Sequence, residues 1–349
     1  MADELAEYRR RRGLGASPEP SEAPPEKPAA RGDRFVVHEQ RTPQLHWNLR
    51  LERDGVLASW TVPRGVPRSP EGVRLAVRID DQPRGYTGDA EVWDHGSYET
   101  LHWNDHRVEV VLHGERLRGR YALVHRHDPT AENAWKLTRL DPAEDGHEAT
   151  PRFLAPMPAR PGPLPDAAED GEWAYEFAWS GLRTILRAAG GRVTAFDETG
   201  EDVTSRYPEL RGLGTQLGST EVVLDGEIVV FAAGRPDPDG LRRRAAADGA
   251  EARGLVHRHP AFYLVTDVLH LDFRSRLQSP HHERRALLDG LGLAGPHWQT
   301  PPSHPGDGAA VARASRDHGL AGIIAKRRDS PYRPGSANED WIDVRHGTA

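Results

Sequence analysis

The stretch Glu176-Phe-Ala-Trp-Ser-Gly-Leu-Arg183 opens the part of this 349-residue chain whose pattern is clearest. After it, apolar runs with the length of β-strands alternate with segments of helical periodicity. The strand-like runs are 221–231 and 262–269, and the helical segments are 282–291 and 309–315. This mixture predicts an α+β domain.

The first half of the chain has a different pattern, in which short runs alternate apolar and polar residues and are separated by turn residues. Strands spaced so regularly predict a small barrel or sandwich. The runs are 34–38, 46–52, 56–62, 74–79, 107–113 and 119–124.

Two stretches of low complexity mark the domain boundaries. Residues 16–33 are rich in Pro, Glu and Ala without apolar periodicity, which is typical of a flexible segment. Residues 141–151 have the composition of an interdomain linker. We therefore expect a flexible segment at 1–33, a barrel at 34–140, a linker at 141–151 and an α+β domain at 152–349.

The composition excludes several kinds of site. Without cysteine, the chain has no disulfide, thiolate metal site or cysteine nucleophile. Lysine occurs only at Lys27, Lys136 and Lys326, so all but three of the 46 basic residues are arginines, which cannot serve as amine nucleophiles.

The charge and hydropathy of the chain bear on its partners. A net charge of −7 argues against a general attraction to nucleic acid, although a local groove can still be basic. No apolar run reaches 18 residues and no secretory signal is present, so we expect no membrane partner. We expect a cytoplasmic protein, with association with a bacterial nucleoid left open.

Motifs in both halves resemble, in the same order, the phosphoesterase and ligase modules of the bacterial DNA ligase D family. The resemblance covers nearly the whole chain. It implies a small β-barrel joined to a nucleotidyltransferase-like (ATP-grasp-like) α+β domain, with ATP and Mn²⁺ or Mg²⁺ as cofactors in active relatives. The motifs are Leu45-His46-x-x-x-Arg50-Leu-Glu52, Asp54-Gly-Val-Leu-x-Ser-Trp60, Leu112-His-Gly-Glu-x-Leu117, Arg206-Tyr-Pro-Glu-Leu210, Leu224-Asp-Gly-Glu227 and Ala325-Lys-Arg-Arg-Asp-Ser-Pro-Tyr-Arg-Pro-Gly335.

The ligase resemblance fails at the reacting positions. The family signature Lys-x-Asp-Gly-x-Arg becomes Ala178-Trp-Ser180-Gly-Leu-Arg183, so the position of the nucleophilic lysine holds alanine and no catalytic residue is assigned. Ala321, Asp343 and Thr266 replace a glutamate, a phosphate-binding lysine and an adenine-stacking aromatic residue. The resemblance implies a nucleotide cleft that keeps Arg183, Glu227 and Lys326.

Two interpretations of Lys326 stay open beside the nucleotide contact that the resemblance implies. The lysine could serve as a substitute nucleophile from another motif. It could equally be a surface ammonium group beside Arg327 and Arg328.

The phosphoesterase resemblance fails at the metal. Where the family has two histidines and an aspartate as metal ligands, this chain has Gln40, His46 and Asn48. Amide oxygens are weaker donors than imidazole or carboxylate, so only a weak metal site is expected. The alternative interpretation is that His46 is an ordinary barrel histidine.

The residues that remain could hold a phosphate or a DNA 3′-end without a metal. We expect His46 and Arg50 to share a face of their strand, because residues of like parity do so. The resemblance predicts one pocket formed by Arg12, His46, Arg50, Ser59, Arg64, Arg74 and Tyr86.

The resemblance also predicts a member without the oligonucleotide-binding and polymerase modules. We therefore expect a catalytically impaired pseudo-ligase and pseudo-phosphoesterase of double-strand-break repair. Its expected partners are DNA ends and an end-joining protein such as a Ku homologue or a complete ligase. Two alternatives are an active ligase or 3′-phosphoesterase with a diverged site, and a regulatory protein that does not bind nucleic acid.

Overall fold

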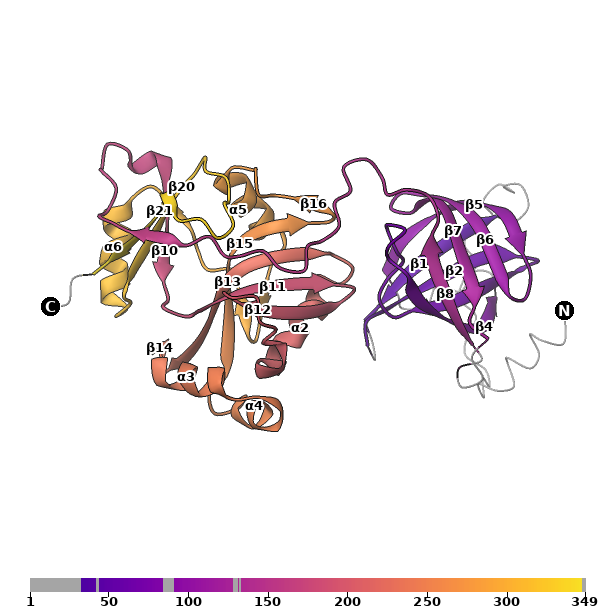
Figure 1. Cartoon of the computed structure of the whole chain (residues 1–349), viewed down its shortest axis with the longest axis horizontal. Helices are drawn as coiled ribbons and strands as arrows, with labels where there is room; N and C mark the ends of the chain where they lie inside the picture. The colour runs from indigo at the N-terminus through magenta and orange to yellow at the C-terminus, as the bar shows by residue number, and fades with distance from the viewer. Residues whose placement is uncertain (1–32, 42–43, 84–90, 128–130, 132, 347–349) are drawn as a thin grey trace, which may run out of the picture. The chain divides into compact units, whose positions relative to one another are not determined.

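The computed structural model describes residues 33–41, 44–83, 91–127, 131 and 133–346. The predicted flexible segment at 1–33, apart from its last residue, and the site residues Arg12 and Tyr86 lie outside the described residues. The chain divides between Ala143 and Glu144 into two compact units (Figure 1).

The first unit is a closed eight-stranded barrel with antiparallel neighbours in the order β1-β2-β3-β4-β8-β7-β6-β5 (Figure 1). The predicted barrel is therefore confirmed. The sequence pattern did not reveal β5 and β8. The strands are β1 (Arg34–Gln40), β2 (His46–Arg53), β3 (Val56–Val62), β4 (Arg74–Pro83), β5 (Glu91–Trp103), β6 (Arg107–Gly114), β7 (Arg118–His125) and β8 (Ala134–Arg139).

Alternation along each strand fills the barrel. On β2 the side chains of Trp47, Leu49 and Leu51 are at most 1% exposed and belong to one core, because alternate residues of a strand point to the same face. Trp60 of β3 packs edge-on against Trp135 of β8, with ring centroids 5.8 Å apart. The intervening residues of β1, β2 and β3 form the opposite face, which is mostly polar apart from Val36 and Leu57 and carries the predicted residues Gln40, His46, Asn48, Arg50 and Ser59.

The second unit contains two sheets and five helices. The smaller sheet has the strand order β19-β10-β20-β21-β9, and the larger has β12-β11-β13-β15-β18-β17 with β14 and β16 added at its side. The fold is mixed α+β, as predicted. The elements are β9 (Ala159–Pro161), β10 (Trp173–Ala178), β11 (Leu182–Ala189), β12 (Arg192–Asp197), α2 (Arg211–Leu217), β13 (Val222–Ala232), β14 (Arg235–Pro236), α3 (Pro238–Ala246), α4 (Gly249–Leu255), β15 (Ala261–Leu271), β16 (Arg274–Ser275), α5 (His281–Gly290), β17 (Ala294–Gly295), β18 (Trp298–Gln299), β19 (His304–Pro305), α6 (Gly308–Asp317), β20 (Gly322–Arg327) and β21 (Asn338–Arg345), with 3₁₀ turns at Asp170–Glu172, Thr204–Arg206 and Pro208–Leu210.

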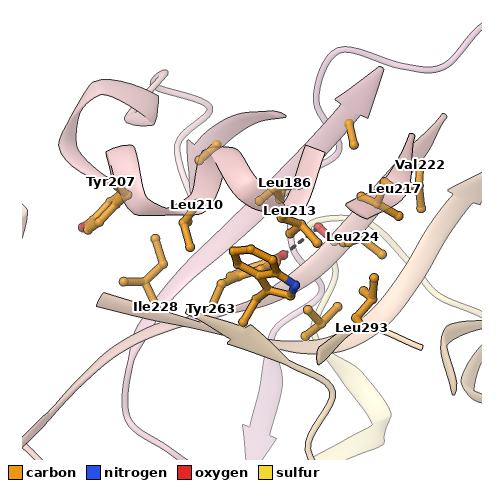
Figure 2. Packing of buried hydrophobic residues seen from close by; sticks show 14 of the residues in the cluster. Leu186, Tyr207, Leu210, Leu213, Leu217, Val222, Leu224, Ile228, Tyr263 and Leu293 are labelled. Atoms are coloured by element: carbon orange, nitrogen blue, oxygen red, sulfur yellow. Dashed lines mark hydrogen bonds between the residues drawn. The ribbon is translucent and has the colours of Figure 1, made fainter. Parts of the chain in front are cut away.

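The core of the larger sheet lies beneath α2 (Figure 2). Leu210 and Leu213 pack with Leu186 of β11 and Tyr263 of β15 in this core, where all four side chains are at most 1% exposed. The hydroxyl of Tyr263 lies 3.2 Å from the carbonyl oxygen of Leu224, so the one polar group of the ring has an acceptor. Among the described helices, none is long and apolar enough to cross a membrane.

The segment predicted as a linker, 141–151, makes ordered contacts within each unit. Asp141 accepts a hydrogen bond from the backbone of Arg120 at 2.8 Å in the first unit. In the second unit His147 stacks on Phe273, with ring centroids 4.4 Å apart.

Two buried ion pairs hold helices of the second unit in place, one against the 3₁₀ turn at Pro208–Leu210 and one against the larger sheet. Arg244 of α3 donates to both carboxylate oxygens of Glu209 at 2.9 Å, and both side chains are at most 1% exposed. Arg284 of α5 pairs in the same way with Asp267 of β15 at 2.8 and 2.9 Å. Glu209 belongs to the motif 206–210, so this motif has a structural role in the fold.

Removal of Arg244 tests this role. Arg244→Ala leaves the buried carboxylate of Glu209 without its cation, and we expect the free energy of unfolding to fall by about 3–5 kcal/mol. Arg242→Ala on the same helix removes only an exposed pair with Asp239 and should change stability by less than about 0.5 kcal/mol. Urea unfolding followed by circular dichroism measures both, and equal losses would contradict the assignment.

Candidate functional site: a nucleotidyltransferase-like cleft and a phosphoesterase-like face

A cleft of about 570 Å³ lies in the second unit between the turn that joins β10 to β11 and strand β21. The predicted nucleophile position and two of the three predicted cleft residues line it. The lining includes Ala178, Ser180, Gly181, Arg183, Glu227, Asp343 and Arg345.

The β10–β11 turn is held by Glu227. The backbone N–H of Gly181 donates to the Glu227 carboxylate at 2.7 Å. A side chain at Gly181 would place its Cβ only 2.6 Å from the carbonyl oxygen of Ile228, so this position requires glycine. Ser180 lies in the left-handed region at φ 55°. Gly181 and Glu227 of the family pattern thus have structural roles in this turn that do not depend on catalysis.

Arg183 is committed to a buried carboxylate. Its Nε donates to Asp225 at 2.6 Å and its Nη2 to the second oxygen at 2.5 Å, while Tyr332 donates its hydroxyl to the same group at 2.7 Å. Burial alone would lower the pKa of Arg183, but the Asp225 carboxylate raises it well above its usual value. Arg183 therefore lines the cleft as one half of an ion pair.

Lys326 is buried, so its interpretation as a surface ammonium group is wrong. The side chain is 2% exposed, and Nζ lies 2.9 Å from a Glu176 carboxylate oxygen and 3.3 Å from the carbonyl oxygen of Thr266. The ammonium also lies 4.3 Å from the ring centroid of Trp341, a cation–π contact. Packing of β20 between β10 and β21 explains the burial, which the neighbouring arginines in the sequence did not indicate.

The carboxylate of Glu176 is the centre of this polar cluster. Burial by itself raises its pKa, but the charge of Lys326, a hydrogen bond with His281 and the charge of Arg285 lower the pKa overall. The Glu176 carboxylate lies 3.8 Å from the His281 ring and 3.6 Å from the Arg285 guanidinium. His281 and Arg285 come from α5, so the sequence pattern around Glu176 and Lys326 did not predict them as members of the cluster.

Strand pairing separates Lys326 from the missing nucleophile. Ala178 lies opposite Gly322, whereas Lys326 lies opposite Ala174. The two positions are four residues apart along the sheet, which is roughly 13 Å between backbones. Nothing in the described residues replaces the amine at Ala178, which is 3% exposed.

Arg345 joins two residues that line the cleft, Ser180 and Asp343. Its Nη1 lies 3.2 Å from the hydroxyl of Ser180, and its Nε pairs with Asp343 at 2.8 Å. The carboxylate of Asp343, which stands where the family has a phosphate-binding lysine, therefore pairs with an arginine of its own strand.

The three degenerate metal positions of the barrel do meet, as predicted, on the polar face of β1 and β2. His46 Nε2 lies 3.1 Å from the Gln40 side-chain oxygen, and Asn48 donates to that oxygen at 3.2 Å. Thr61 of β3 donates to Asn48 at 2.8 Å. The amide groups satisfy one another and no carboxylate is present to offset a cation, so this set does not fit a divalent metal.

Arg50 shares the polar face with His46, as parity predicted, and pairs with a residue that the sequence did not single out. Its Nη1 lies 3.2 Å from Nδ1 of His38, and both side chains are at most 5% exposed. Burial first, and then the charge of Arg50, lower the pKa of His38 to about 4. His38 and Gln40 are two residues apart on β1 and so share a face, and this alternation could have predicted His38 as a neighbour of Arg50. Ser59 lies opposite Arg50 on β3 and donates its hydroxyl to the Leu57 carbonyl at 2.8 Å.

Two other predicted pocket residues lie elsewhere. Arg64 is exposed just after β3. Arg74 has the parity of Ala76, whose side chain is in the barrel core, so it lies on the face of β4 opposite to that of Val77 and Ile79. Those two residues pair with the polar face of β3. The structure therefore does not bring Arg74 to Arg50, and the prediction of one pocket that contains both is corrected.

Each of the two units matches a different known domain family. Residues 37–125 match the DNA Ligase D 3′-phosphoesterase domain, and residues 163–345 match the ATP dependent DNA ligase domain. The fold and cleft thus define a chain with a phosphoesterase-type barrel and a ligase-type nucleotidyltransferase domain.

Curated relatives match the chain across both units. The chain is 36% identical over 365 residues to the multifunctional non-homologous end joining DNA repair protein LigD of Mycobacterium tuberculosis, a match that covers 99% of this chain and 46% of the relative. It is 31% identical over 412 residues to LigD of Pseudomonas aeruginosa, with 98% and 47% covered. The crystal structure of the ligase domain of M. tuberculosis LigD is 36% identical with a TM-score of 0.49, and covers 56% of this chain and 60% of that chain. The chain belongs to the DNA ligase D family, and it spans about half the length of these curated relatives.

The pair of His38 and Arg50 makes barrel stability depend on pH. The unfolded histidine has a pKa near 6.5 and the folded one a pKa of about 4, so the stability is complete above pH 6.5 and declines as the pH falls towards 4. Between pH 7.5 and 5 we expect a loss of about 1 to 2 kcal/mol from this group.

His38→Gln keeps an acceptor for Arg50 but cannot be protonated. Urea unfolding at pH 7.5 and pH 5 should therefore show a smaller pH dependence for the variant than for the natural protein. An identical pH dependence in both proteins would rule out His38 as the titrating group.

Proposed function

We propose that this chain is a catalytically impaired member of the ligase D family that binds DNA ends during non-homologous end joining. The observation that carries the proposal is the buried alanine at position 178, where the family signature has its nucleophilic lysine. The single lysine of the second unit is held by Glu176, roughly 13 Å away along the sheet, and so supplies no substitute.

The charges of the cleft support the proposal. Arg183 is paired with Asp225, Lys326 with Glu176, and Arg345 with Asp343. A triphosphate would have to break these pairs or add its own negative charge beside a carboxylate, and both cost free energy. These ion pairs therefore support a structural role for the charged residues of the cleft and not a role in nucleotidyl transfer.

The barrel gives parallel support. Gln40, His46 and Asn48 use their polar atoms on one another, so removal of a 3′-phosphate by a metal-bound water has no matching ligand set in this chain. If the protein binds DNA ends without catalysis, the reactive groups of both units are expected to be absent, as they are here.

DNA ends are the partner that the family relationship favours, because the relatives are named for non-homologous end joining. A Ku homologue or a complete ligase is a further candidate partner on the same basis. With a net charge of −7, contact with DNA must be made by local basic side chains, of which Arg64 is exposed at the end of β3.

An adenylation assay tests the loss of catalysis. The purified chain, incubated with labelled ATP and Mg²⁺ or Mn²⁺, should carry no label after denaturing electrophoresis. Ala178→Lys alone should also stay unlabelled, because Ser180, Ala321 and Asp343 still replace family residues around the nucleotide.

The matched control is Lys326→Gln. A lysine-linked adenylate on the natural chain would overturn the proposal. Its disappearance in Lys326→Gln would then identify that lysine as the nucleophile of an active, diverged enzyme.

Fluorescence anisotropy with a blunt DNA duplex that carries a 3′-phosphate tests end binding. We expect the affinity to fall as salt rises, and Arg64→Glu to weaken it by about three- to tenfold. Arg243→Glu, on the exposed side of α3, is the matched control and should have little effect. Binding that is absent, or that does not respond to salt, would support the alternative of a regulatory protein that does not bind nucleic acid.

A further inference from the structure

Three histidines of the barrel that no predicted site contains converge at one rim. His106 follows β5, His125 ends β7, and His127 comes two residues later. Each offers one ring nitrogen such that these atoms all lie within 4.8 Å of one another. The ring centroids of His106 and His125 are each 4.8 Å from that of His127.

The backbone explains why these rings meet. The N–H of His125 donates to the carbonyl oxygen of His106 at 2.9 Å, which extends the pairing of β6 with β7 by one step. Asn104 accepts from the backbone N–H of His106 at 2.9 Å and so fixes the turn. His127 has a left-handed backbone at φ 49°, and its ring lies beside the other two. Two hairpin ends thus deliver three imidazoles to one place.

One ring of the three is anchored and the other two are accessible. His125 is half-buried and packs edge-on against Trp135, with centroids 5.4 Å apart. Its Nδ1 already accepts a long hydrogen bond of 3.3 Å from the N–H of His127, which metal binding could replace at small cost. His106 and His127 are exposed, so their rings can turn without disturbing the core.

Three neutral imidazoles are a ligand set that zinc accepts. With Zn–N bonds of about 2.0–2.1 Å in a tetrahedron, ligand nitrogens lie about 3.3 Å apart, so the rings need close by only about 1.5 Å. Such a set leaves the fourth position for water or another oxygen ligand. No carboxylate or arginine is needed for the geometry.

We propose that His106, His125 and His127 bind Zn²⁺ with an open fourth position. His125 also lines a hollow of about 290 Å³ with Trp60, Trp103 and Trp135, so an oxygen ligand of the ion has space beside it. The site is separate from the degenerate metal positions on β2. Trp103, which precedes the turn of His106, contacts Arg53 at the end of β2, roughly 23 Å along that strand from His46.

Titration of the tag-free, demetallated full chain tests the proposal without reference to DNA or nucleotide. Isothermal titration with ZnCl₂ should give one site per chain, and Co²⁺ should give the visible absorption of a low-coordinate complex. His106→Ala and His127→Asn should each weaken zinc binding at least tenfold. Asn is chosen at 127 because it tolerates a left-handed backbone.

Two matched controls locate the ion. His113→Ala removes an exposed barrel histidine that pairs with Glu99, and His46→Ala removes the imidazole of the degenerate set. Both should bind zinc as the natural chain does, and circular dichroism should show all four variants folded. Loss of binding in His46→Ala with retention in His127→Asn would overturn the proposal, and so would the absence of saturable binding.

Discussion

The bidentate pair of Arg183 and Asp225 is the interaction on which the second unit depends. Tyr332 donates to the same carboxylate and accepts from the backbone N–H of Met157 at 2.7 Å, so one buried charge joins β11, β13 and two loops. Trp341 of the smaller sheet packs against Tyr332, with ring centroids 5.5 Å apart. Both sheets therefore meet around this pair. A change at Asp225 would leave the cleft without its support, whatever chemistry the cleft performs.

This dependence explains which motif residues persist. In a buried network, removal of one partner leaves an uncompensated charge that costs several kcal/mol, so each member is retained for stability alone. Arg183, Glu227 and Glu209 all have such partners. At Ala178 and Ser180 the family signature has a lysine and an aspartate that act on a ligand and not on the fold, and the Ser180 hydroxyl contacts an exposed side chain, that of Arg345. The packing thus gives Arg183, Glu227 and Glu209 a structural role that does not depend on any reaction.

The sequence predicted the barrel, the α+β domain and the shared face of His46 and Arg50, because strand alternation is a local signal. It could not place Arg74, since the parity of β4 relative to β3 is set by an irregularity in their pairing near Ser59. Of the interpretations of Lys326 that the sequence left open, the surface ammonium group is wrong, because a run of basic residues indicates exposure whereas the side chain is buried against Glu176 and Trp341. The sequence did not single out His38 or the histidines at 106, 125 and 127. Their contacts come from other strands and turns, which a local sequence pattern does not reveal.

The two units share one physical solution to the absence of their family's reacting groups. In the barrel, neutral amides at Gln40 and Asn48 hydrogen-bond each other, whereas a buried aspartate at position 48 would need a cation. In the cleft, Asp343 has Arg345 as its partner in place of a phosphate. In each place the replacing residue has a partner within the chain, so its polarity or charge is offset without a ligand.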